Sequence, residues 1–119
     1  MATAKTAGVL RAEIHELMTR TAQLLGFDRD LSPPYLVNGF MGSGYAKPTP
    51  GGRDAMSLLA RSEGMLTDPV YTAKALDAVV KLASSHEFGK GPVVFWHTGG
   101  LPALFAEDQG LMRWYEWPS

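Results

Sequence analysis

The chain has 119 residues, of which 45% are hydrophobic and 19% charged, with a formal net charge of -1 and no cysteine. This globular composition argues against disorder, and the lack of cysteine excludes disulfides, thiolate metal sites and a cysteine nucleophile. No cluster of lysine and arginine favours nucleic acid or an anionic membrane, and no run of about 18 apolar residues could span a bilayer. We therefore expect a soluble, cytoplasmic protein of at most one domain.

The first half of the chain predicts one long helix, a short strand and a loop. From about Thr6 to Leu25, apolar residues recur at helical spacing with charged residues between them, and Gly26 suits a helix stop. Residues 35–40, YLVNGF, form a short apolar run after two prolines and predict a strand. Residues 41–52 contain four glycines and two prolines, which predicts a loop.

The second half predicts two helices before another strand. Residues 53–64 predict a short helix that ends at Gly64. Asp68 suits the cap of the next helix, and Pro69 suits its first position, where a missing N–H is no loss. The apolar face of this helix consists of Val70, Ala73, Leu76, Val80 and Ala83.

The end of the chain decides the predicted fold class. Residues 92–96, PVVFW, form a continuous apolar run, as expected of a strand buried on both faces of a parallel sheet. The sequence HTGG follows, Pro102 begins a last short helix, and residues 107–119 form an irregular aromatic tail. We predict an α/β fold with an open, mostly parallel sheet flanked by helices. Two strands do not complete such a sheet, so residues 1–119 are interpreted as a single partial domain completed by another chain.

The turn after residues 92–96 is a candidate ligand site. Ligands of open α/β sheets gather at the carboxyl ends of strands, and Gly99 and Gly100 would let the backbone approach one closely. The alternative is a plain turn between a strand and a helix. His97 could act as a base or a ligand, or be structural, and no other histidine lies at metal-ligand spacing, so we expect no metal site. Tyr45 and Tyr71 taken alone are equally open to a packing role.

Three strings taken in order change these odds: GSGYAKPT, LLARSEGMLTDPVYTAKAL and VVFWHTGGLPALFA. Together they resemble the closing segments of the D-cysteine desulfhydrase and aminocyclopropane-carboxylate deaminase family. This family belongs to the tryptophan synthase β-like class of pyridoxal-phosphate enzymes. The resemblance covers about Asp30 to Ala106 and, more loosely, the first predicted helix.

The resemblance implies roles for particular residues. Tyr45 matches a tyrosine that lies beside the cofactor, and Tyr71 matches a second active-site tyrosine that acts on substrate protons or on the substrate carboxylate. Thr98 matches the residue that hydrogen-bonds the pyridine nitrogen in desulfhydrases. Its neighbours His97, Gly99 and Gly100 are then expected at the cofactor as well.

The resemblance also favours one branch of the family. A threonine hydroxyl forms a neutral hydrogen bond with the pyridine nitrogen, which makes the ring a milder electron sink than a carboxylate would. Such a ring suits β-elimination of a good leaving group. Deaminases of the family carry a glutamate where this chain has Thr72, and they lack the threonine that is Thr98 here. A desulfhydrase-like elimination is therefore favoured over a deaminase reaction.

Two parts of the family's site are missing from the sequence. The Schiff-base lysine and the glycine-rich phosphate loop lie in the N-terminal part of family members, and no lysine of this chain has that context. We therefore expect a subunit of a split lyase or deaminase, inactive alone, in a hetero-oligomer whose other chain carries the lysine. Two alternatives stay open: a non-catalytic binding or assembly module, and a fragment of a longer enzyme.

Overall fold

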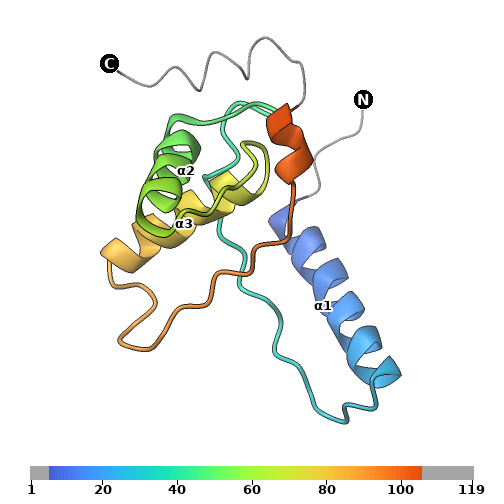
Figure 1. Cartoon of the computed structure of the whole chain (residues 1–119). Helices are drawn as coiled ribbons and strands as arrows, with labels where there is room; N and C mark the ends of the chain where they lie inside the picture. Colours follow the sequence, from blue (N-terminus) through green and yellow to red (C-terminus); the bar gives the residue numbers. More distant parts are fainter. Residues whose placement is uncertain (1–5, 106–119) are drawn as a thin grey trace, which may run out of the picture. The chain divides into compact units, whose positions relative to one another are not determined.

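A computed structural model describes residues 6–105 of the chain. The elements, in chain order, are α1 (Ala7–Leu24), α2 (Pro50–Glu63), α3 (Thr72–Ser84) and a short 3-10 helix, η1 (Leu101–Phe105) (Figure 1). The chain divides into two units between Val37 and Asn38, and each unit is described by itself. The predicted aromatic tail, residues 107–119, lies outside the described residues.

Helix α1 forms where the sequence predicts the first helix. The Thr6 side chain accepts a hydrogen bond from the Val9 N–H at 3.4 Å, which caps the first turn. At the other end Gly26 adopts φ 72°, a left-handed conformation that glycine tolerates without steric cost. No residue of α1 is buried.

The segment after α1 returns along the helix and is tied to it by two polar contacts. The Arg11 Nε donates to the Pro34 carbonyl at 3.0 Å, and the His15 Nε2 lies 2.6 Å from the Leu31 carbonyl oxygen. These bonds satisfy carbonyl groups of a segment that has no regular structure of its own.

Helix α2 begins three residues before the predicted start at Arg53. The Thr49 hydroxyl accepts a hydrogen bond from the Gly52 N–H at 3.1 Å, and Pro50 occupies the first helical position. A threonine cap followed by proline is a helix-start signal, and here it outweighs the poor helix propensity of two glycines. The predicted stop is confirmed, because Gly64 caps the helix in the left-handed conformation.

Helices α2 and α3 pack side by side through small residues (Figure 1). The buried apolar side chains of the described residues are those of Ala55 on α2 and Ala73, Leu76 and Ala78 on α3. Gly52 is buried as well, and a Cβ built on it would lie 3.6 Å from the Cβ of Ala73. Residues this small let the two helix backbones approach closely.

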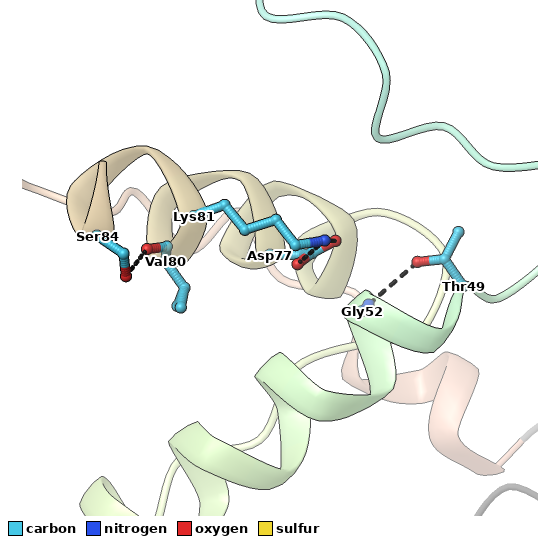
Figure 2. A network of polar contacts seen from close by, with 6 residues as sticks. All are labelled: Thr49, Gly52, Asp77, Val80, Lys81 and Ser84. Carbon is cyan, nitrogen blue, oxygen red and sulfur yellow. Dashed lines mark hydrogen bonds and ion pairs between the residues drawn. The ribbon is translucent and has the colours of Figure 1, made fainter. Parts of the chain in front are cut away.

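An acidic residue of α3 lies at the beginning of α2. A Cβ on Gly51 would lie only 2.6 Å from the Cγ of Asp77, so the carboxylate occupies the space where a side chain would be. Lys81, one turn further along α3, pairs with this carboxylate at 2.9 Å (Figure 2). The negative charge of Asp77 is favourable here because the first turn of a helix carries a partial positive charge.

The predicted fold class is wrong: residues 6–105 contain no strand, so the α/β prediction and its open parallel sheet are overturned. Residues 35–40 and 92–96 have no regular structure and no neighbouring strand in the described part of the chain. Val94 and Trp96 are each 81% exposed, although the sequence predicted burial on both faces. A run of apolar residues indicates that a segment could be buried as a strand. A strand forms, however, only where a neighbouring strand hydrogen-bonds to it.

Two further boundaries differ from the sequence prediction. Residues 69–71 form a turn, so α3 begins at Thr72 and not at Pro69. The last short helix is a 3-10 helix that begins at Leu101, one residue before Pro102. Among the described residues, no helix has both the length and the apolar character needed to cross a membrane.

We predict that Gly51→Ala destabilises the α2–α3 pair by about 1–3 kcal/mol, the usual cost of overfilling a packed site. Gly8→Ala is the matched control, because Gly8 is also the second residue of a threonine-capped helix but has no atom within 4 Å of its Cβ position. Gly8→Ala should leave stability unchanged or raise it slightly, since alanine is the better helix former. Urea unfolding followed by circular dichroism measures both. Equal effects at the two glycines would contradict the packing described here.

Candidate functional site

The candidate site lies in the second unit, where three segments distant in sequence are joined by specific contacts. The turn 68–71 at the start of α3 is the middle segment. The loop 41–47 is joined to it through Tyr45, and the segment 97–100 is joined to it through Gly100. His97 contacts Leu66, which precedes the turn by two positions. These are the three segments that carry the family resemblance.

The turn before α3 is built around the carboxylate of Asp68, which is 0% exposed. Its Oδ1 accepts hydrogen bonds from the N–H groups of Val70 and Tyr71 at 2.8 and 2.7 Å. Its Oδ2 accepts from the N–H of Thr72 at 2.8 Å and from the Thr72 hydroxyl. The Thr72 hydroxyl in turn accepts from the Asp68 N–H at 2.9 Å. The Asp68 side chain thus accepts hydrogen bonds from the backbone N–H groups at the beginning of α3, which have no acceptor within the helix.

The same contacts decide the charge of Asp68. Burial alone would raise the pKa of the carboxyl, because it penalises the charged form. The hydrogen bonds from Thr72, Tyr71 and Val70 act in the opposite direction and prevail, so the pKa of Asp68 lies below its ordinary value of 3.8. At neutral pH the turn is therefore organised around a buried negative charge.

The segment HTGG lies directly against this turn. A Cβ on Gly100 would lie 2.5 Å from the Asp68 Oδ2 and 2.9 Å from its Cβ, so only glycine fits beside the carboxylate. Gly100 also adopts φ 100°, a conformation that side-chain-bearing residues rarely adopt. Gly100 therefore fixes how closely this segment approaches the turn that carries Tyr71.

His97 holds the same segment from its other end. The Gly99 N–H donates to the His97 Nδ1 at 3.1 Å, and the His97 Nε2 lies 2.9 Å from the Leu66 carbonyl oxygen. Since Nδ1 accepts, the ring proton is assigned to Nε2, which donates to Leu66. Both ring nitrogens are thus used within the chain, which favours the structural reading of His97. Its assignment to cofactor binding stays a prediction.

The two predicted catalytic tyrosines meet at this site. The hydroxyl oxygens of Tyr45 and Tyr71 lie 2.5 Å apart, and their rings are in edge-on contact with centroids 6.0 Å apart. Tyr45 comes from the loop 41–47 and is 79% exposed, whereas Tyr71 lies next to α3 and is 57% exposed. The two side chains therefore form a hydroxyl pair that faces solvent.

This pair can present a proton to a ligand. The hydrogen bond to Tyr45 raises the pKa of Tyr71 above its ordinary value of 10, and desolvation and the nearby charge of Asp68 act in the same direction. The Tyr71 hydroxyl accordingly stays protonated at neutral pH. Two hydroxyls that share one hydrogen bond keep one hydrogen for a further acceptor.

The last of the predicted site residues, Thr98, belongs to the HTGG segment. Thr98 is exposed, and its hydroxyl forms no hydrogen bond within residues 6–105.

Of the described lysines, Lys74 donates to main-chain carbonyls and Lys81 pairs with Asp77. Within residues 6–105 no cluster of three or more histidine, aspartate or glutamate side chains could hold a metal ion.

Three residues of the site were not identified by sequence reasoning. Asp68 was predicted only as a helix cap, Thr72 was noted only as a difference from deaminases, and Lys74 was considered only among the lysines that lack the context of the Schiff-base lysine. A threonine four residues after Asp-Pro is a signal for the closed turn, because its hydroxyl can reach back to the carboxylate. The bonds that Lys74 makes to the loop 41–47 leave no local pattern in the sequence.

No family model matches the chain. Over 103 residues it is 38% identical to the D-cysteine desulfhydrase of Yersinia pestis (strain Pestoides F) and to that of Yersinia pseudotuberculosis serotype O:1b (strain IP 31758). Each alignment covers 86% of this chain and 31% of the relative, in the relative's C-terminal part. The chain thus spans about a third of the length of the curated relatives it matches. The resemblance predicted from the sequence is confirmed.

We predict that Asp68→Asn lowers the free energy of unfolding by about 1.5–3 kcal/mol at pH 7, because the amide nitrogen cannot accept the two bonds from Thr72. The pKa of Asp68 is lower in the folded than in the unfolded chain. Its stabilisation is therefore complete above the unfolded pKa of about 4 and is lost as the pH falls through the folded pKa. Urea unfolding between pH 7 and pH 2 should show this loss in the native chain and a flatter profile in Asp68→Asn.

Asp54→Asn, at an exposed position on α2, is the control for loss of one carboxylate and should change the unfolding free energy by less than about 0.5 kcal/mol. Superimposable pH profiles for the native chain and Asp68→Asn would show that the buried carboxylate does not organise the turn.

Proposed function

Because the chain is homologous to the C-terminal part of D-cysteine desulfhydrases, we propose that it is the tyrosine-bearing part of a pyridoxal-phosphate-dependent lyase. The substrate class is a small amino acid with a leaving group on the β carbon, such as D-cysteine. The lysine-bearing part is supplied by a partner chain in a hetero-oligomer. The observation that supports this proposal most is the exposed hydroxyl pair of Tyr45 and Tyr71, formed at the turn whose Asp68 lies against Gly100 of the HTGG segment.

The residues of this chain fit one side of a cofactor site. Pyridoxal phosphate, when bound, supplies an electron sink for bonds that break at the α carbon of an amino acid. The free, exposed hydroxyl of Thr98 is suited to a neutral hydrogen bond with the pyridine nitrogen. Gly99, at φ 102°, and Gly100 leave no side chain between the backbone and a planar ligand. The covalent attachment needs a lysine from elsewhere, because the Schiff-base lysine of the family lies in the N-terminal part of its members and no lysine of this chain has that context.

Tyr71 is the residue to which we assign proton transfer. Its backbone N–H is held by Asp68, and its hydroxyl is held by Tyr45, so the group is fixed at both ends. Its pKa lies above the ordinary value of 10, so the hydroxyl carries its proton at neutral pH and is the group that we propose donates it to substrate. Tyr45 orients this hydroxyl and accepts or returns the shared proton.

A non-catalytic assembly module is the second candidate function. The exposed apolar side chains near the site favour it, among them Val94 and Trp96, each 81% exposed. The two candidates differ in what they require: a lyase needs the hydroxyl groups of Tyr71 and Thr98, whereas a module that only binds a partner through apolar surface does not.

We predict that mixing this chain with the N-terminal two-thirds of a D-cysteine desulfhydrase, in the presence of pyridoxal phosphate, restores release of sulfide from D-cysteine. Neither part should be active alone. Tyr71→Phe should bind the partner normally but lower turnover by about 10²–10⁴-fold, the usual effect of losing one proton-transfer group. Tyr35→Phe is the control, because Tyr35 is also exposed but lies in the first unit. Full activity of Tyr71→Phe, with binding retained, would favour the assembly module.

We further predict that borohydride reduction of the mixture labels a lysine of the partner and none of this chain. Peptide mass spectrometry locates the label. A pyridoxyl group on Lys74 or Lys47 would contradict the division of the site between two chains.

A further inference from the structure

The loop that carries Tyr45 has little packing to hold it. Met41 is 73% exposed and Tyr45 is 79% exposed, so neither side chain buries enough surface to fix the loop. Ala46 adopts φ 57°, a left-handed conformation that is unfavourable for a residue with a Cβ. An exposed loop with such a residue relaxes unless another group holds it.

Lys74 supplies the polar contacts that hold this loop. Its Nζ donates to the Met41 carbonyl at 2.8 Å and to the Gly44 carbonyl at 3.4 Å, across 33 and 30 positions of sequence. An ammonium group has three donors and no acceptor, so it can bond two carbonyls of one loop at once. Both carbonyls belong to residues that precede Tyr45 in the sequence, and Gly44 is its immediate neighbour.

Lys74 and Tyr71 contact the same loop from one side of the same helix start. They are three positions apart, which places them on one face of a helix, one turn from each other. Tyr71 bonds the Tyr45 hydroxyl, and Lys74 bonds the backbone that leads into Tyr45. Tyr45 is therefore held at both its backbone and its side chain by residues at the start of α3.

We propose that Lys74 is a positioning residue: its ammonium group holds residues 41–44 against the start of α3, so that the Tyr45 hydroxyl meets that of Tyr71. The structural part of this inference stands on the contacts alone. Its consequence for catalysis rests on the proposed function. In this role Lys74 cannot also attach a cofactor covalently, since its Nζ donates hydrogen bonds to the carbonyls of the loop.

The test is the contact between the two tyrosine rings in the full chain with labelled tyrosines. The native chain should show nuclear Overhauser effects between the rings of Tyr45 and Tyr71. Lys74→Met keeps the length of the side chain but removes all three donors, so these effects should disappear while the helical circular dichroism stays unchanged. Lys74→Arg keeps the charge and the donors and should retain the ring contact at least in part.

Lys47→Met is the matched control, because it makes the same substitution within the same loop at a side chain that bonds none of the described residues. It should leave the ring contact intact. Retention of the contact in Lys74→Met, or its equal loss in Lys47→Met, would overturn the proposal. If Lys74→Met lost its helical signal as well, Lys74→Arg would decide: loss of the ring contact in that variant, while its helical signal and the contact in Lys47→Met persist, would overturn the proposal.

Activity in the reconstituted mixture separates this inference from the proposed function. If both hold, Lys74→Met should lower turnover by about 10²-fold, as misplacement of a catalytic group by about 1 Å does, with little change in partner binding. Lys74→Arg should recover most of that loss. Loss of the ring contact with unchanged turnover would contradict the proposed role of the tyrosines and leave the positioning role of Lys74 intact.

Discussion

The buried carboxylate of Asp68 is the interaction on which the candidate site depends. It accepts bonds from three consecutive backbone N–H groups and from the Thr72 hydroxyl, and Gly100 lies directly against it. Each of these contacts fixes a different part of the site: the backbone of Tyr71, the start of α3 and the HTGG segment. An unpaired charge at this depth would be costly, so the bonds and the charge stabilise each other.

The other described contacts of the second unit hold the elements around this turn in place. Helices α2 and α3 pack through alanines and glycines, and the Asp77 carboxylate of α3, which pairs with Lys81 (Figure 2), occupies the space where a side chain on Gly51 of α2 would be. The loop 41–47 is held in place by polar contacts as well, which come from Lys74 of α3 and from Tyr71 just before it. With so small an apolar core, the geometry of the site is set mainly by hydrogen bonds at the start of one helix.

The sequence predicted the helices of this chain better than its strands. Helical spacing and caps are local signals, so α1 and the stop at Gly64 follow from neighbouring residues, and the start at Thr49 was missed only because two glycines follow it. The apolar run 92–96 gave the wrong fold class because pairing between strands is not a local property. Tyr45, Tyr71 and Thr98 were predicted through the family resemblance, since a single tyrosine or threonine carries no sequence pattern of its own. The contacts of Lys74 and Gly100 could not be predicted, because each joins positions about 30 residues apart.

Hydrogen exchange at the turn before α3 tests the central claim most directly. If the Asp68 carboxylate holds the turn, the backbone amides of Val70, Tyr71 and Thr72 should exchange slowly at neutral pH, although they precede or begin the helix and have no helical acceptor. Exchange of these three amides at the rate of an unstructured peptide, while amides within α3 stay protected, would show that the carboxylate does not organise the site.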